Sequence, residues 1–251
     1  MPQSLPISNF KGLMDRRVLG QDLETTTSLD NVLIRNGTVR GRSGIALWDS
    51  ISTAGGSAIV GMAEFYAPNS ATSSLLRMRT VGVDKWNSSS HAWDNVTGTA
   101  LTGDANTRPV FHTLSNEGYI VFTNEGHDRP RKYTGTGNTA TLGGTPPYAK
   151  WLCPFVGFLF LFNTSTDGTF ALPADPITAY FSDTPDSNWD TCTGNALIFD
   201  ETPGEVRAAQ TYGDSLLVFK SDALIQVRFV GGITRFQRRK LQFSQGILAP
   251  M

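Results

Sequence analysis

Acidic side chains gather in one stretch of the chain, and a pair of carboxylates is what a glycosidase uses for acid–base or nucleophilic catalysis. The stretch contains Asp183, Asp186, Asp190, Asp200 and Glu201. A sugar-binding surface also needs aromatic platforms, for which the candidates are Trp86, Trp93 and Trp189. Carbohydrate binding or cleavage is therefore one function hypothesis for this chain.

Other catalytic chemistry lacks the necessary residue spacing. His91, His112 and His127 lie far apart, with no metal-binding HxH or HExxH pattern, and we expect His112 in a strand and the other two in turns. No Gly-x-Ser-x-Gly or phosphate-binding glycine motif occurs. Cys153 and Cys192 are too few for a disulfide framework; we expect two buried thiols, with a bridge between them as the alternative. We therefore expect a non-enzyme without cofactor or metal.

Composition favours a single large all-β domain. The chain has 251 residues, 39% of them hydrophobic, and a formal net charge of −1, which argues against purely electrostatic binding to nucleic acid or membrane. Its 25 glycines and 13 prolines are spread along the chain, as expected where turns join many short strands. No apolar run approaches the roughly 20 residues of a membrane helix, so we expect no membrane insertion.

A tight hairpin marks where the regular part of the chain begins. Val32–Arg35 alternates like a half-buried strand, Asn36-Gly37 suits a type I′ turn, and Thr38 and Val39 start the return strand. Residues 1–29 show no sustained period. We therefore predict an irregular N-terminal arm over 1–29 and a β-domain over 30–251.

Downstream of the hairpin, short strands recur in units of roughly 40 to 55 residues, the period of propeller blades. Gly118–Phe122, Gly157–Phe162 and Gly213–Phe219 are similar apolar strands at corresponding places. The predicted fold class is all-β, a β-propeller-like array of about four four-stranded blades; a β-sandwich is the rival. The units cover residues 43–98, 109–144, 149–189 and 196–238. Because a fifth unit would begin near Phe243, we expect a fragment, a partner covering the open side, or four units that close on themselves.

Two groups of residues are candidates for assembly contacts. Apolar residues of the arm either cover its own domain or reach a neighbouring subunit, and arginines follow in the hairpin. Basic residues further on form a solvated strand face or line a channel or an acidic partner. The arm and hairpin candidates are Ile7, Phe10, Leu13, Met14, Arg35, Arg40 and Arg42, and the channel or partner candidates are Arg131, Lys132, Arg238 and Arg239.

Several phrases, in order along the chain, resemble tail-associated virion proteins of tailed bacteriophages. They are Asn9–Gly12, Asp30–Gly44, Asp84–Gly98, Gly144–Lys150, Tyr180–Asp183 with Trp189, Tyr212–Lys220 and Gln245–Pro250. The resemblance implies a non-catalytic β-propeller subunit of the tail nozzle, hub or neck, usually in a ring around the DNA channel. The implied partners are other tail or neck proteins and copies of the chain itself, with non-specific proximity to phage DNA. The implied location is the virion, and the host cytoplasm during assembly.

Overall fold

A computed structural model describes residues 57–66, 73–170, 175–186, 189, 195–232, 235–241 and 246, and the backbone of four short strands nearer the N-terminus. The chain divides into two compact units, Met1–Ser50 and Ile51–Met251. Each unit is described by itself below.

The N-terminal unit contains two pairs of short strands. β1 (Gly12–Leu13) and β2 (Thr25–Thr26) are parallel. β3 (Val32–Arg35) and β4 (Thr38–Gly41) form an antiparallel hairpin whose strands are joined by two residues, as predicted. The hairpin belongs to the N-terminal unit, and the predicted boundary after residue 29 stays a prediction.

Within the described residues, the C-terminal unit forms four antiparallel sheets of four strands each. In every sheet, strands that are consecutive in the chain are neighbours. The first and second sheets contain β5 (Ile59–Tyr66), β6 (Ser73–Arg79), β7 (Gly82–Asn87) and β8 (Ala92–Asn95), and β9 (Pro109–Leu114), β10 (Tyr119–Asn124), β11 (Arg131–Tyr133) and β12 (Ala140–Thr141), respectively. The third sheet contains β13 (Tyr148–Phe155), β14 (Phe158–Ser165), β15 (Thr178–Ser182) and β16 (Ala196–Ile198). The fourth sheet contains β17 (Val206–Tyr212), β18 (Ser215–Lys220), β19 (Leu224–Phe229) and β20 (Phe236–Lys240).

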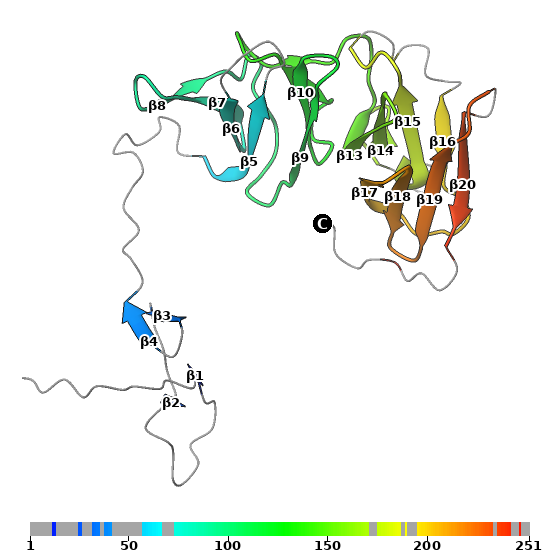
Figure 1. Ribbon diagram of the computed structural model, residues 1–251. Coiled ribbons are helices and arrows are strands. Elements are labelled where there is room, and N and C mark those ends of the chain that lie inside the picture. The colour runs from blue at the N-terminus through cyan, green and yellow to red at the C-terminus, as the bar shows by residue number, and fades with distance from the viewer. Residues whose placement is uncertain are drawn as a thin grey trace, which may run out of the picture. The chain divides into compact units, whose positions relative to one another are not determined.

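The sheets follow one another in chain order (Figure 1). The first strands of successive sheets touch, β5 with β9, β9 with β13 and β13 with β17, so these strands form the inner edge of the array. This is a β-propeller-like arrangement, which confirms the predicted fold class and excludes two sheets stacked as a sandwich.

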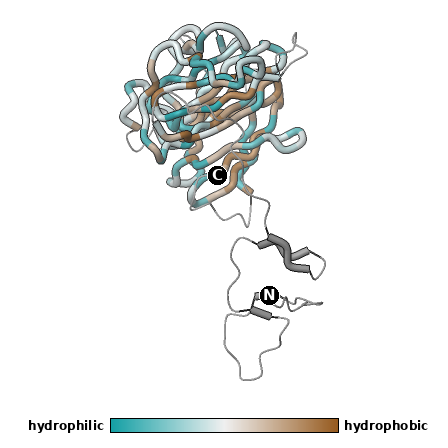
Figure 2. Tube along the Cα trace, turned by 90° about the vertical axis from the view of Figure 1, so that its left-hand side faces the viewer, coloured by the Kyte–Doolittle hydropathy of each residue, from teal (hydrophilic) through white to brown (hydrophobic). Residues whose placement is uncertain are grey.

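A separate hydrophobic core lies between each pair of successive sheets. On β10, Ile120 and Phe122 face the first sheet, whereas Tyr119 and Val121 face the third. On β14, Leu159 and Leu161 face the second sheet, and Phe160 faces the fourth together with Phe162. The most apolar segments of the chain, brown in Figure 2, accordingly lie in the strands. The second strand of each inner sheet begins with an unbroken apolar run, Tyr119–Phe122 in β10 and Phe158–Phe162 in β14, because both of its faces are covered.

The glycine that precedes the second strand has a backbone role. Gly118, Gly157 and Gly213 have φ angles of 76°, 77° and 58°, in the turns before β10, β14 and β18. A left-handed conformation costs a side-chain-bearing residue about 1–2 kcal/mol, and glycine avoids this cost. The recurrence that predicted the repeat therefore reflects one turn geometry used three times.

Two strands were predicted wrongly. The sequence predicts one strand over Leu75–Val81, but the chain turns at Thr80–Val81 and returns as β7. β16 was expected to open the fourth unit, yet it pairs with β15 and completes the third sheet. The sequence does not indicate this turn, because threonine and valine favour strands. The predicted strand Ile45–Trp48 lies outside the described residues.

Helical structure is minor in the described part of the chain, where η1 (Asp175–Ile177) is a single 3₁₀ turn. No helix in that part is long and apolar enough to cross a membrane.

Candidate functional site

The two sheets at the ends of the array each present a face that no other described sheet of the chain covers. We call the side of β5–β8 turned away from the second sheet the first-sheet face. Directly paired residues share a face, and Met62 pairs with Arg77, which pairs with Asp84. Ile59, Met62 and Tyr66 project from the same face and are 54%, 54% and 61% exposed. These three apolar side chains all lie on the strand at the inner edge of the array.

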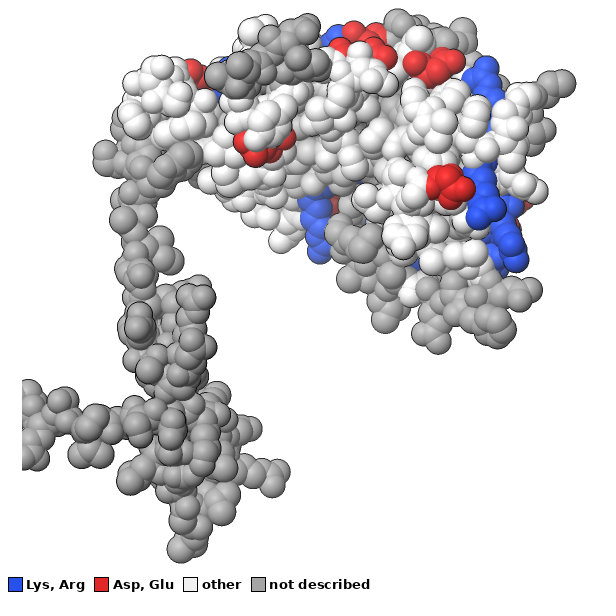
Figure 3. All heavy atoms as spheres, viewed as in Figure 1, with Lys and Arg blue, Asp and Glu red and all other residues white. Residues whose placement is uncertain are grey.

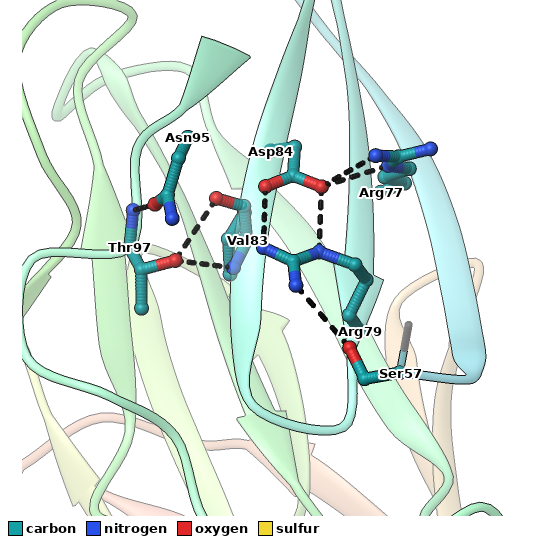
Figure 4. Close-up of polar contacts among 7 residues, drawn as sticks. All are labelled: Ser57, Arg77, Arg79, Val83, Asp84, Asn95 and Thr97. Carbon is teal, nitrogen blue, oxygen red and sulfur yellow. Dashed lines mark hydrogen bonds and ion pairs between the residues drawn. The ribbon is translucent and has the colours of Figure 1, made fainter. Parts of the chain in front are cut away.

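Two buried arginines share one carboxylate on the first-sheet face (Figure 4). Asp84 Oδ2 accepts hydrogen bonds from Arg77 Nε at 2.8 Å and from Arg79 Nε at 2.7 Å, and its Oδ1 accepts one from Arg79 Nη2 at 2.8 Å. The three side chains are only 3–7% exposed. The hydrogen bonds to Asp84 raise the pKa of Arg79 above its usual value. Both oxygens of the Asp84 carboxylate thus accept hydrogen bonds from guanidinium groups.

An aromatic pair completes the cluster. The guanidinium carbon of Arg77 lies 4.3 Å from the centre of the Trp93 ring, and Trp93 packs edge-to-face on Trp86 at 5.4 Å. Asn87 donates to Asp94 Oδ2 at 2.8 Å across the same hairpin. Trp93-Asp94 therefore packs and fixes a β-hairpin, as expected from the sequence. The similar pair Trp48-Asp49 lies outside the described residues.

Arg79 belongs to a set of buried polar residues that end the second strand of three sheets. Arg79 Nη1 donates to Ser57 Oγ at 3.2 Å, and Asn124 Nδ2 donates to the Thr102 carbonyl at 2.7 Å. The Lys220 ammonium donates to the Thr202 and Phe199 carbonyls. Each residue thus ties its strand to the segment that precedes the first strand of its own sheet. Burial lowers the pKa of Lys220, but its hydrogen bonds hold it in a structural role.

The fourth sheet presents the opposite end, which we call the fourth-sheet face. Cross-strand pairs place Leu217 beside Gln226, Gln226 beside Arg239, and Arg228 beside Gln237. Leu217 is half-buried, whereas Arg228 and Arg239 are exposed. Lysine and arginine side chains gather along the edge formed by β20 (Figure 3). This face is therefore basic.

The predicted carboxylate region is a structural contact. Asp186 accepts hydrogen bonds from the Lys132 ammonium and from the Gly143 N–H, the latter at 3.1 Å, and so joins the third sheet to the second. Trp189 is 3% exposed, and its indole N–H donates to the Pro185 carbonyl at 2.5 Å. The expectation of Trp189 as an exposed sugar platform is wrong, because the side chain fills the core between the second and third sheets. Asp190 lies outside the described residues.

The predicted basic residues occupy different environments. Arg131 is 6% exposed and donates to the carbonyls of Thr99 and Ala100, the latter at 3.1 Å; burial lowers its pKa. Lys132, as noted, contacts Asp186. Arg238 on β20 pairs with Asp200 Oδ1 at 3.2 Å, and the adjacent Arg239 is exposed.

The structure therefore places Arg131 and Lys132 on the second sheet and Arg238 and Arg239 on the fourth, without bringing the two pairs together. The arm and hairpin candidates have no described side chains.

Reactive groups have unreactive surroundings. Burial lowers the pKa of His112, a residue of β9, and raises the pKa of the free, buried thiol of Cys153. His91 and His127 lie in turns, as predicted. A cavity of about 230 Å³ at the turns that end the inner strands contains Glu117 as its one titratable residue among those described. In the same part of the chain, no group of three or more His, Cys, Asp or Glu could hold a metal ion.

Comparison with known proteins gives similarity at the level of the fold alone. No protein-family model matches the chain, and no curated protein matches it. A catalytically inactive virginiamycin B lyase from Staphylococcus aureus with quinupristin is 9% identical, with a TM-score of 0.45 and coverage of 82% of this chain and 61% of that one. A selenomethionine-substituted form of that lyase, also from Staphylococcus aureus, is 10% identical, with a TM-score of 0.42 and coverage of 73% and 60%.

A third similar structure is the computationally designed Ika8 protein, at 18% identity, a TM-score of 0.40 and coverage of 76% of this chain and 51% of that one. The chain thus spans between half and two thirds of the length of these proteins. Identities and TM-scores this low carry no argument about function.

Proposed function

We propose that the chain is a non-catalytic structural subunit of a tailed-phage virion, located in the tail, neck, nozzle or hub. The observation that carries a structural role is the pair of end faces that no other described sheet covers, on an array whose inner sheets are buried on both sides. A β-propeller blade normally packs against a neighbour on each face. The virion assignment itself rests on the ordered sequence phrases that resemble tail-associated proteins.

Apolar surface on the first-sheet face supplies the affinity for a neighbour. Burying such surface contributes about 25 cal/mol per Å² before the costs of association are subtracted. Ile59, Met62 and Tyr66 project from one strand. They lie on one face of that strand, which favours a packed protein contact over scattered exposed side chains that need no partner.

Basic residues of the fourth sheet suit an acidic neighbour or DNA that passes without being read in sequence. Arg239 is exposed, and Arg238 forms an ion pair with Asp200. Contacts of this kind act on phosphates or carboxylates by charge and carry no base specificity. The N-terminal arm is the second docking element of the proposal.

Purification of the particles of the phage that encodes the chain, followed by quantitative mass spectrometry, tests the proposal. We expect the chain at a fixed number of copies per particle. A chain that is absent from the particles would refute a virion role.

A glycan-binding screen addresses the carbohydrate hypothesis. Trp86 and Trp93 are the aromatic residues of that hypothesis that lie at the surface, half-buried and packed on each other. Saturable sugar binding that Trp86→Ala or Trp93→Ala abolishes, without loss of folding, would contradict the structural proposal. We expect no such binding.

A further inference from the structure

We propose that the first-sheet face of one copy docks on the fourth-sheet face of a second copy. The proposal deepens the structural role by naming the partner of the end faces. It makes the contact head-to-tail, between two different surfaces of the same chain. Two copies joined in this way at both ends would place eight sheets around one axis, the upper end of the range typical of β-propellers.

The first-sheet face presents an apolar row with one exposed acid in it. Glu64 lies on β5 between Met62 and Tyr66, on the same side of the sheet. The Tyr66 hydroxyl donates to Glu64 Oε1 at 2.9 Å, which fixes the position of the carboxylate. This hydrogen bond also raises the pKa of Tyr66. The charge that this row offers to a neighbour is therefore negative.

The fourth-sheet face presents the complementary charge. Gln226, Arg228, Gln237 and Arg239 line a groove of about 250 Å³ together with Arg238, and the lining residues that the structure describes include no acidic one. Gln226 is held by a 2.8 Å hydrogen bond from its Nε2 to Ser215 Oγ. Arg228 and Arg239 are both exposed on this face, and guanidinium groups bind carboxylates through paired hydrogen bonds. Leu217 and the 76%-exposed Tyr212 supply apolar area on the same sheet.

The distribution of charge selects the head-to-tail arrangement over the two symmetric ones. Packing the first-sheet face on its own copy would bring two Glu64 carboxylates together. Packing the fourth-sheet face on its own copy would bring together two sets of Arg228 and Arg239. Like charges facing each other across a contact disfavour it, whereas Glu64 against these arginines is attractive. A contact between two different patches of one chain closes into a ring when its rotation allows.

A pair of single-face variants tests the contact. Glu64→Lys alters the first-sheet face, and Arg228→Glu with Arg239→Glu alters the fourth-sheet face; all three side chains are exposed, so folding should persist. The wild type at roughly 100 µM should be dimeric by light scattering, a concentration at which contacts with a Kd of about 10 µM are populated. Each variant alone should be monomeric, because each lacks one side of every contact.

Mixing the two variants gives the decisive result. Each still carries the surface that the other has lost, so an equimolar mixture should recover a one-to-one dimer. Val81→Asp, at an exposed turn between β6 and β7, is the matched control and should stay dimeric. Circular dichroism and thermal unfolding confirm that every variant is folded.

Three results would overturn the inference: a monomeric wild type, a single-face variant that still dimerises, or a mixture that stays monomeric. A monomeric chain found in phage particles would end the head-to-tail pairing but leave the virion role intact.

Discussion

Asp84 is the residue whose loss the first sheet would tolerate least. Its carboxylate is shared by Arg77 and Arg79, and all three side chains are almost fully buried. Removing one partner from a buried ion cluster leaves uncompensated charge in a medium that solvates it poorly. The cluster therefore stabilises the first sheet only while all three charged side chains are present.

Asp84→Asn should lower the free energy of unfolding by about 3–5 kcal/mol, because two buried guanidinium groups lose their counter-charge. Urea denaturation at neutral pH measures the change. The matched control is Asp94→Asn on β8, an exposed carboxylate bonded to Asn87, which should cost less than about 1 kcal/mol. Equal effects of the two substitutions would mean that the arginine cluster adds nothing to stability.

His112 gives the chain a predictable response to acid. Burial lowers its pKa from the ordinary value of 6.5, so the folded state disfavours its charged form. Between the folded and unfolded pKa values the unfolded chain binds more protons, and stability therefore rises with pH. The contribution is complete above about pH 6.5 and is lost as the pH falls below that value.

Unfolding free energies measured from pH 7.5 to 5 should accordingly fall more steeply for the wild type than for His112→Gln, which has no charge to gain. His91→Gln, at an exposed turn, is the comparison and should follow the wild-type curve. If His112→Gln and the wild type ran parallel, the acid sensitivity would have to come from other groups.

Residue-scale predictions from the sequence failed where burial decided the role. Arg77 and Arg79 alternate with apolar residues, a pattern equally typical of a solvated strand face. Only the return of β7 after Thr80–Val81, which sets Asp84 opposite Arg77, turns them into an ion cluster. The signal was the Asp84 carboxylate a short turn away from two arginines spaced by two. The prediction that Trp189 is exposed was wrong for a related reason, because its neighbours in the core include residues of a different sheet.

At the scale of elements, the turn between β13 and β14 contains a residue whose type is unfavourable for its backbone conformation. Val156 and Gly157 join Phe155 to Phe158, and both central residues have positive φ, 49° and 77°. A β-branched side chain is disfavoured in that conformation, whereas asparagine tolerates it. Val156 is half-exposed and so contributes little burial in return.

Val156→Asn should therefore stabilise the protein by about 1 kcal/mol, seen as a higher midpoint of thermal unfolding. Val81→Asn is the control, since Val81 is a similarly exposed turn valine outside the residues with positive φ. It should bring no gain. A neutral or destabilising Val156→Asn would mean that the turn changes conformation to suit its residues.

Elements were predictable where a periodic signal and a turn signal coincided. β10, β14 and β18 combine an apolar run with a preceding glycine, and all three occupy the second position of their sheets. β7 and β16 lack one of these two signals. β7 follows a turn, Thr80–Val81, that has no glycine, and β16 is only three residues long. Strand identity there depends on pairing with a neighbour, which local sequence does not encode.

At the scale of the whole molecule, the two compact units allow the arm and the sheets to be tested apart. Deleting residues 1–29 removes part of the N-terminal unit, Met1–Ser50, and leaves the sheets of the other unit intact. The unfolding free energy should therefore change by less than about 1 kcal/mol. Incorporation into particles should fall at least about tenfold, the effect of losing 1.4 kcal/mol of docking energy.

Quantitative mass spectrometry of particles, with the full-length chain in parallel, measures that loss. Full incorporation of the shortened chain would remove the arm from the docking proposal and leave the end faces as its basis.

The end faces of the sheet array should be assembly surfaces in the intact particle, and a reconstruction of that particle by electron cryo-microscopy would show whether they are. We expect four sheets side by side, with the side chains of Ile59, Met62 and Tyr66 covered by a neighbouring polypeptide and Arg239 beside an acidic group. Density in which these three side chains face solvent in the assembled particle would contradict it.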